Sequence, residues 1–227
     1  MTSELPAEYY DEFHGVDAHY SKNYRKSRYY ALFRAILKEL NDIRPSLILE
    51  VGCGSGVLAQ MLQEQLPSVS YRGFDFSRTA VGRAGRRTGR QDMFFVADAR
   101  SAAAYESDYD AIVCTEVLEH IEDDLDVIRN WRPGTPCICS VPNFLNDEHV
   151  RCFRHESEVC ERYGDLLSIS KVRRVATPVM TQTGFGDYLR RLRWSRNDPR
   201  KLAGLLGINR FNYLAGWFMF AGTRRAD

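Results

Sequence analysis

A run of apolar residues passes directly into a glycine-rich turn, and this feature limits the folds that the chain can adopt. The run extends from Ile48 to Gly56 and reads Ile-Leu-Glu-Val-Gly-Cys-Gly-Ser-Gly. Glycine permits backbone conformations that are closed to other residues and lets a ligand approach the main chain. The third glycine comes one residue earlier than in the Gly-x-Gly-x-x-Gly pattern of dinucleotide folds, and the turn lacks the Gly-Lys-Ser/Thr of a phosphate loop. The turn predicts a ligand crevice at the end of a buried strand, although it could also serve only to pack a helix on a sheet.

Short apolar runs alternate with helical patterns along the chain, which favours an α/β fold with a mostly parallel sheet. The expected strands cover residues 47–51, 70–75, 93–96, 109–114, 136–141, 167–175 and 211–223. The expected helices cover residues 20–41, 57–65, 78–87, 124–131 and 156–163. Near-continuous hydrophobicity in the first and fourth strands suits strands that are covered on both faces. We therefore expect a doubly wound sheet.

The composition indicates an ordered protein without a strong charge of either sign. The chain has 227 residues, of which 44% are hydrophobic, and 31 Lys+Arg against 30 Asp+Glu give a net charge of +1. These values exclude a disordered chain and argue against a protein that binds polyanions over its whole surface. We expect one domain over residues 1–227, with an N-terminal helical cap over about 1–44 and an insertion over about 177–207.

Neither a transmembrane segment nor a secretory signal is expected. The longest apolar run, residues 213–222, is about half of the roughly 20 residues that a membrane span needs. The acidic N-terminus has no apolar segment of the kind found in signal peptides. The six cysteines follow no disulfide-framework spacing, so we expect reduced thiols and a cytoplasmic protein.

Three acidic residues occupy informative places around the expected crevice. Glu50 lies inside the first strand, where a carboxylate suits an ammonium-bearing ligand better than a pyrophosphate. Asp75 ends the second strand about 20 residues after the glycines, where an acid binds ribose hydroxyls in related folds. Phe74 and Phe76 flank it, and one of them could pack on a purine. Asp98 follows the third strand, where it could accept a hydrogen bond from an adenine amino group.

This ordered set resembles the class I S-adenosylmethionine-dependent methyltransferases, over roughly residues 47–143. The resemblance implies a Rossmann-like, doubly wound, seven-stranded, mostly parallel sheet with an antiparallel last strand. It also implies that the methionine part of S-adenosylmethionine is held by Glu50, Gly52, Gly54 and Gly56, the ribose by Asp75 and the adenine by Asp98. Phe76 and Cys114, the latter at the end of the fourth strand, complete the expected cofactor-binding set.

A cluster of acids and histidine follows the fourth strand. Glu116, Glu119 and His120 are spaced at i, i+3 and i+4, so a short helical turn would place them on one face. The loop after the next strand brings His149 towards the same edge of the sheet. Two carboxylates and two imidazoles could hold Mg²⁺ or another divalent ion. Without a metal, His120 is the expected general base, assisted by Glu119.

The Glu-x-x-Glu-His pattern of Glu116, Glu119 and His120 is similar to two groups of methyltransferases. One is the small-RNA 3′-terminal 2′-O-methyltransferases, in which the motif is associated with a metal. The other is the ubiquinone-biosynthesis O-methyltransferases and the methyltransferase type 11 group. Both resemblances place these side chains beside the transferred methyl group.

We therefore predict an S-adenosylmethionine-dependent methyltransferase that acts on an oxygen of a small-molecule acceptor. The near-neutral charge favours a small acceptor over RNA. A metal-dependent RNA 2′-O-methyltransferase remains the alternative within the same class, and a non-catalytic cofactor-binding module the alternative outside it. We expect the insertion and the N-terminal helix to border the acceptor, with Tyr20, Tyr24 or Arg25 either near the methionine carboxylate or on an exposed helix face.

Overall fold

The structure is a computed structural model that describes residues 4–16, 23–144, 148–176, 193 and 216–226. Its centre is a seven-stranded sheet with the strand order β3-β2-β1-β4-β5-β7-β6. The strands are β1 (Leu47–Val51), β2 (Ser70–Asp75), β3 (Phe94–Val96), β4 (Ala111–Thr115), β5 (Pro136–Pro142), β6 (Leu167–Ala176) and β7 (Gly216–Arg224). The first five are parallel, and β7 lies antiparallel between β5 and β6. The predicted Rossmann-like fold with an antiparallel last strand is confirmed.

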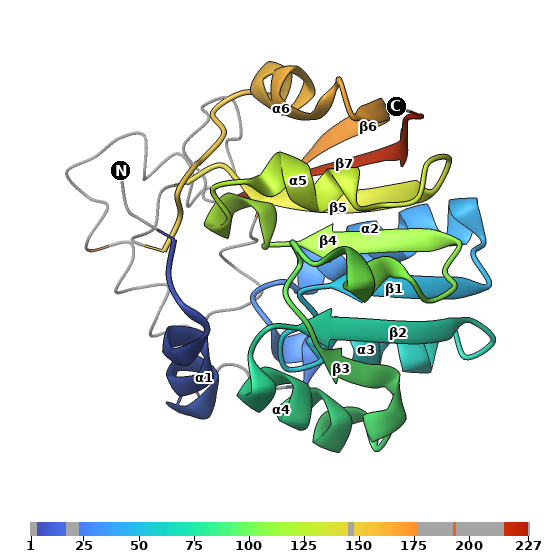
Figure 1. The fold of residues 1–227 in the computed structure, drawn as a ribbon, viewed down its shortest axis with the longest axis vertical. Helices are drawn as coiled ribbons and strands as arrows, with labels where there is room; N and C mark the ends of the chain where they lie inside the picture. The colour runs from blue at the N-terminus through green and yellow to red at the C-terminus, as the bar shows by residue number, and fades with distance from the viewer. Residues whose placement is uncertain (1–3, 17–22, 145–147, 177–192, 194–215, 227) are drawn as a thin grey trace.

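Helices cover both faces of this sheet (Figure 1). The α-helices are α1 (Ala7–Val16), α2 (Tyr30–Ile43), α3 (Val57–Gln65), α4 (Arg78–Thr88), α5 (Asp124–Arg129) and α6 (Glu156–Tyr163). The short 3₁₀ helices are η2 (Tyr24–Lys26), η3 (Gln91–Met93), η4 (Ala102–Tyr105) and η5 (Leu118–His120). Buried side chains of α2, α3 and α4 form one apolar cluster with the sheet, and those of α5 and α6 form a second. The sheet is therefore buried on both sides, as its near-continuous apolar strands predicted.

The helix predicted over residues 20–41 is wrong at its start. Residues 17–22 lie outside the described part, η2 follows, and α2 begins only at Tyr30. The Asn23 side chain accepts a hydrogen bond from the Arg25 amide at 3.0 Å, and such local bonds compete with a helix. Tyr24 is 1% exposed and donates its hydroxyl to Glu64 of α3, which fixes the chain before α2 starts.

The other predicted boundaries lie within a residue or two of the observed ones wherever both are described. The expected insertion over about 177–207 lies outside the described residues except for Arg193, as does the predicted start of the last strand. Among the described helices, none is both long enough and apolar enough to cross a membrane.

Candidate functional site

A pocket lies at the carboxyl ends of β1, β2 and β4. It is lined by the glycine turn, the loops after β2, β3 and β4, the start of α2 and the N-terminal residues Glu4, Leu5 and Tyr10. In Figure 1 the arrowheads of β2 and β4 point towards the side on which α1 lies. This is the edge at which open α/β sheets bind their ligands.

The three glycines of the turn divide into two roles. All three have positive φ angles, 68° at Gly52, 49° at Gly54 and 71° at Gly56. Gly52 and Gly54 line the pocket, where they expose main chain to a ligand. Gly56 caps the N-terminus of α3, and a Cβ atom there would lie 2.9 Å from the Cα atom of Ala84 in α4. Gly56 therefore permits close packing of α3 on α4 and is not among the residues that line the pocket.

The buried carboxylates beside the glycine turn already have hydrogen-bond partners. Asp75 accepts hydrogen bonds from the Gly54 amide and the Ser77 amide, both at 2.9 Å, and burial raises its pKa to about 6. Glu50 is 3% exposed and accepts a hydrogen bond from the Tyr71 hydroxyl. Burial raises the pKa of Glu50 to about 8, so a cationic ligand would favour its ionised form. Both acids line the pocket.

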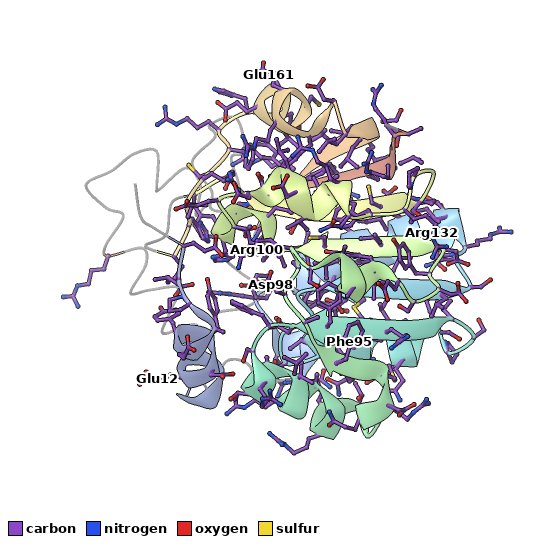
Figure 2. The ribbon with its side chains drawn as sticks, in the orientation of Figure 1. Glu12, Phe95, Asp98, Arg100, Arg132 and Glu161 are labelled. Atoms are coloured by element: carbon purple, nitrogen blue, oxygen red, sulfur yellow. The ribbon has the colours of Figure 1, made fainter. Side chains whose placement is uncertain are left out.

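Asp98 and Phe76 also line the pocket, whereas Cys114 does not. Asp98 pairs with Arg100, whose Nη2 lies 2.7 Å from Asp98 Oδ2, and this partner lowers the pKa of Asp98. The pair lies near the centre of Figure 2. Cys114 is fully buried in the apolar core, and its neighbour Thr115 lines the pocket instead.

Glu116 occupies a constrained position after β4. Its φ angle is 57°, which is uncommon outside glycine and is associated with functional sites. Its carboxylate accepts hydrogen bonds from the Ser140 hydroxyl at 3.0 Å and from the Trp217 indole N–H. Burial raises its pKa to about 7. The carboxylate is thus fixed by β5 and β7.

Three of the four predicted metal ligands converge beside it. One ligand atom each from Glu119, His120 and His149 lies within 4.8 Å of the other two, and Glu116 is not part of this group. Glu119 is fully buried, and neither of its carboxylate oxygens has a hydrogen-bond partner among the described residues. Burial, reinforced by the nearby Glu116, raises the pKa of Glu119 well above its usual value. The nearest charged-group contact of Glu119 is His120, whose Nε2 lies 3.9 Å from Glu119 Oε1. The raised pKa favours the protonated, neutral form of this buried carboxyl group.

The hydrogen bonds of the two histidines indicate how their rings are protonated. His120 Nδ1 lies 2.9 Å from the Glu148 carbonyl oxygen, and His149 Nδ1 lies 3.2 Å from the Phe144 carbonyl oxygen. A carbonyl oxygen can only accept, so each Nδ1 carries the proton and each neutral ring has its lone pair on Nε2. Burial lowers the pKa of both rings, that of His149 to about 4, which keeps them neutral near pH 7.

An arginine clamp holds the turn that carries Glu119 and His120. The Arg151 guanidinium donates to the carbonyl oxygens of Leu118, Ile121 and Glu122, and it pairs with the buried Asp124 at 2.9 Å. The Val150 amide also donates to the Glu119 carbonyl oxygen at 2.9 Å. These bonds explain why a segment this short has a defined conformation.

Sequence reasoning missed several pocket residues, among them Tyr10 and Arg28. The N-terminal residues singled out from the sequence lie elsewhere or are not described. Tyr24 and Arg25 both bond to Glu64 on α3, and Tyr20 is outside the described residues. Only the aromatic and cationic residues interleaved near the N-terminus hinted at Arg28, and no local pattern distinguished Tyr10.

The chain matches a known protein family and individual proteins of known name. A methyltransferase domain family matches residues 24–165. The ubiquinone biosynthesis O-methyltransferase of Aliivibrio fischeri (strain MJ11) is 31% identical over 99 residues, which are 42% of this chain and 42% of that protein. The chain thus spans less than half of the length of the curated relatives that it matches.

Solved structures share the fold over nearly the whole chain. A SAM-dependent methyltransferase from Geobacter sulfurreducens in complex with S-adenosyl-L-homocysteine has a TM-score of 0.56 at 16% identity, covering 99% of this chain and 100% of that one. The N-methyltransferase NodS from Bradyrhizobium japonicum WM9, also with S-adenosyl-L-homocysteine, has a TM-score of 0.57 at 15% identity, covering 97% and 99%. At these identities the likeness concerns the fold.

Proposed function

The chain belongs to the methyltransferase domain family, within the class I S-adenosylmethionine-dependent methyltransferases, and we propose that it methylates an oxygen atom of a small-molecule acceptor. The observation that supports an oxygen acceptor is His120, which lines the pocket and whose Nδ1 bond to the Glu148 carbonyl leaves the lone pair on Nε2. The buried Glu119 carboxyl group, which is not among the residues that line the pocket, has its Oε1 3.9 Å from this nitrogen. A hydroxyl group must lose its proton to become a good nucleophile. A base or a metal beside the methyl group would have no such task with a neutral amine.

The cofactor takes the glycine side of the pocket in this proposal. The main chain at Gly52 and Gly54 borders the methionine part, and Glu50 is the carboxylate for its ammonium group. Asp75 accepts hydrogen bonds from the ribose hydroxyls while it keeps its bonds to the turn. Phe76 packs on the adenine, and Asp98 accepts a hydrogen bond from the adenine amino group. All six residues line one continuous pocket, which supports this assignment.

The chemical step is an in-line displacement at the sulfonium methyl group. The acceptor oxygen forms a bond to the methyl carbon as the carbon–sulfur bond breaks, and S-adenosylhomocysteine leaves. Without a metal, the acceptor proton passes to Nε2 of His120. The Nδ1–H bond to the Glu148 carbonyl then stabilises the resulting imidazolium. The protein contributes mainly alignment and proton removal.

Glu119, His120 and His149 also fit a divalent cation, because two imidazole nitrogens and an unpartnered carboxylate converge there. Two nitrogen ligands favour a transition-metal ion over Mg²⁺, which prefers oxygen ligands. When bound, such an ion would act as a Lewis acid that lowers the pKa of the acceptor hydroxyl. Nε2 of His120 can bind the ion or accept the proton but not both, so metal removal separates the two versions of this proposal.

Methyl transfer from labelled S-adenosylmethionine tests the proposed function. The acceptors to supply are hydroxylated aromatic acids, matched aromatic amines and a short RNA, because Arg28 and Tyr29 in the pocket suit an aromatic anion. We expect transfer to the hydroxylated acids. Transfer to the amines alone would contradict the proposal, and transfer to RNA with a steep loss of binding at moderate salt would replace the small acceptor by RNA.

Exhaustive treatment with a chelator tests the metal version. Loss of turnover with unchanged binding of S-adenosylhomocysteine, restored by Mn²⁺ in the wild type but not in Glu119→Ala, supports the metal. Full turnover after chelation leaves His120 as the base.

A further inference from the structure

Helix α1 lies at the mouth of the pocket and contributes to its wall. Glu4, Leu5 and Tyr10 line the pocket together with the glycine turn and the loop after β4. Figure 1 shows α1 outside the carboxyl edge of the sheet, as a separate helix beside α4. A ligand held at the glycine turn would therefore lie between the sheet and α1.

Polar contacts at both ends of this segment attach it to the cofactor side. Asp11 Oδ1 accepts hydrogen bonds from the Ser77 hydroxyl at 2.6 Å and from the Thr79 amide at 2.9 Å, at the start of α4. The Ser77 amide in turn donates to Asp75. Glu4 pairs with Arg100 at 2.9 Å, and Arg100 pairs with Asp98. The helix is thus bonded to the same loops that carry the expected ribose and adenine ligands.

Tyr10 extends these contacts to the part of the site formed by Glu116, Glu119, His120 and His149, which we call the acid–histidine side. Its ring packs on Phe76 with a centroid distance of 5.1 Å, and its hydroxyl oxygen lies 3.1 Å from His120 Nδ1. The Nδ1 proton is directed at the Glu148 carbonyl, so the Tyr10 oxygen is a second acceptor for the same N–H group. Burial raises the pKa of Tyr10, which keeps the hydroxyl neutral.

We propose that α1 is a lid over bound S-adenosylmethionine, and that Tyr10 is a positioning residue through which the closed lid fixes the His120 ring with its lone pair on Nε2. The use made of His120 rests on the proposed function. The cofactor enters and S-adenosylhomocysteine leaves only when the Asp11 and Glu4 contacts open. When they close, the Tyr10 oxygen becomes a second acceptor beside the Glu148 carbonyl, which already holds the Nδ1 proton of His120. Closure of the lid therefore encloses the cofactor and, at the same time, holds the His120 ring with Nε2 free to accept a proton or bind a metal.

The lid is tested by the rate at which S-adenosylhomocysteine dissociates, measured by stopped-flow displacement. Asp11→Ala removes both acceptor bonds, and we expect dissociation to be about ten-fold faster or more. Glu12→Ala is the matched control, because Glu12 is an exposed carboxylate of the same helix, labelled in Figure 2. An unchanged rate in Asp11→Ala, or an equal increase in Glu12→Ala, would overturn the lid.

The role of Tyr10 is tested by the ¹⁵N resonances of the His120 ring, which report which nitrogen carries the proton. We expect Tyr10→Phe to shift these resonances. Tyr9→Phe, which removes a hydroxyl that donates to the Glu148 carboxylate from the same helix, should leave them in place. Unchanged resonances in Tyr10→Phe would overturn the positioning role.

Neither measurement requires a methyl acceptor, so the two proposals can fail separately. Shifted resonances and faster dissociation in a protein that methylates no oxygen acceptor would uphold the lid and refute the proposed function. Oxygen methylation with unchanged dissociation and resonances would do the reverse.

Discussion

The two sides of the pocket differ in whether their buried acids have partners. On the cofactor side, Asp75 is bonded to two backbone amides and Glu50 to Tyr71. On the acid–histidine side, both oxygens of Glu119 are without hydrogen-bond partners among the described residues, although the carboxylate is fully buried. On the first side, the buried acids have hydrogen-bond partners within the protein before any ligand binds. The second holds a buried carboxyl group with a raised pKa next to two imidazoles, which is typical of a reacting centre.

The largest effect that this contrast predicts is at Glu119. Glu119→Met replaces an unpartnered buried carboxylate by an apolar side chain of similar volume, so we expect the melting temperature to rise while turnover falls about 100-fold or more. Affinity for S-adenosylhomocysteine should stay within a few-fold of wild type. Differential scanning calorimetry and initial rates check both parts. A melting temperature that falls by several degrees would show that the carboxylate has a stabilising partner after all.

On the cofactor side, Asp75→Ala should weaken S-adenosylhomocysteine binding. A hydrogen bond to a charged acceptor contributes about 1.5–3 kcal/mol, so each ribose bond that is lost lowers the affinity roughly ten- to 150-fold. Asp98→Ala is the comparison, because its half-exposed carboxylate is paired with Arg100 and should lose only a few-fold. Isothermal titration measures both. Equal losses in the two variants would remove the distinction between the buried and the exposed acid.

Alanine variants of two glycines distinguish the cost of backbone strain from the cost of a steric contact. Gly56 and Gly89 have φ angles of 71° and 70°, but only a Cβ atom at Gly56 would meet a neighbour within 4 Å. Both alanine variants therefore carry a strain of about 1–3 kcal/mol. Gly56→Ala adds about 1–3 kcal/mol for the contact with Ala84. Urea denaturation gives the free energies of unfolding, and the same loss in both variants would show that α3 and α4 can separate without cost.

The smallest effect is the pH dependence of stability without ligand. The pKa of Glu50 is about 8 in the folded protein against 4.5 in the unfolded chain, so the folded state binds this proton more tightly. The stabilising contribution of Glu50 is complete below about pH 4.5 and is lost as the pH rises through about 8. The pKa values of His120 and His149 are lowered from 6.5, so these histidines do not change the free energy of unfolding further above about pH 6.5.

The free energy of unfolding should therefore fall between about pH 6.5 and 8, by at most about 1.4 kcal/mol per pH unit for each such carboxyl group. Glu50→Gln should make this fall shallower than in the wild type. Thermal melts across this range give the comparison, and an identical slope in the variant would show that Glu50 is ionised throughout.

The sequence sufficed for the sheet and the glycine turn because their signals are local. Apolar strands and the glycines at 52, 54 and 56 are read from a few neighbouring residues. The fate of Glu116 could not be read in this way. Its spacing to Glu119 and His120 suggested a shared helical face. Instead, its φ angle of 57° and its bond to Trp217, 101 residues away, separate it from the group formed by Glu119, His120 and His149, although Glu116 still lines the pocket. Tyr10 was missed for the same reason, since its partner His120 lies 110 residues along the chain.

The position of β7 between β5 and β6 also has a consequence for how the protein forms in the cell. Residues 167–176 are synthesised before residues 216–224, yet β6 is an edge strand whose neighbour in the sheet is β7. During translation, β6 has no strand to join until β7 has left the ribosome. The Glu116 carboxylate likewise gains its hydrogen bond from the Trp217 indole only after β7 has been synthesised. The glycine turn and β1 to β5 can assemble earlier, so a nascent chain would form the glycine turn first and the bond that holds Glu116 last.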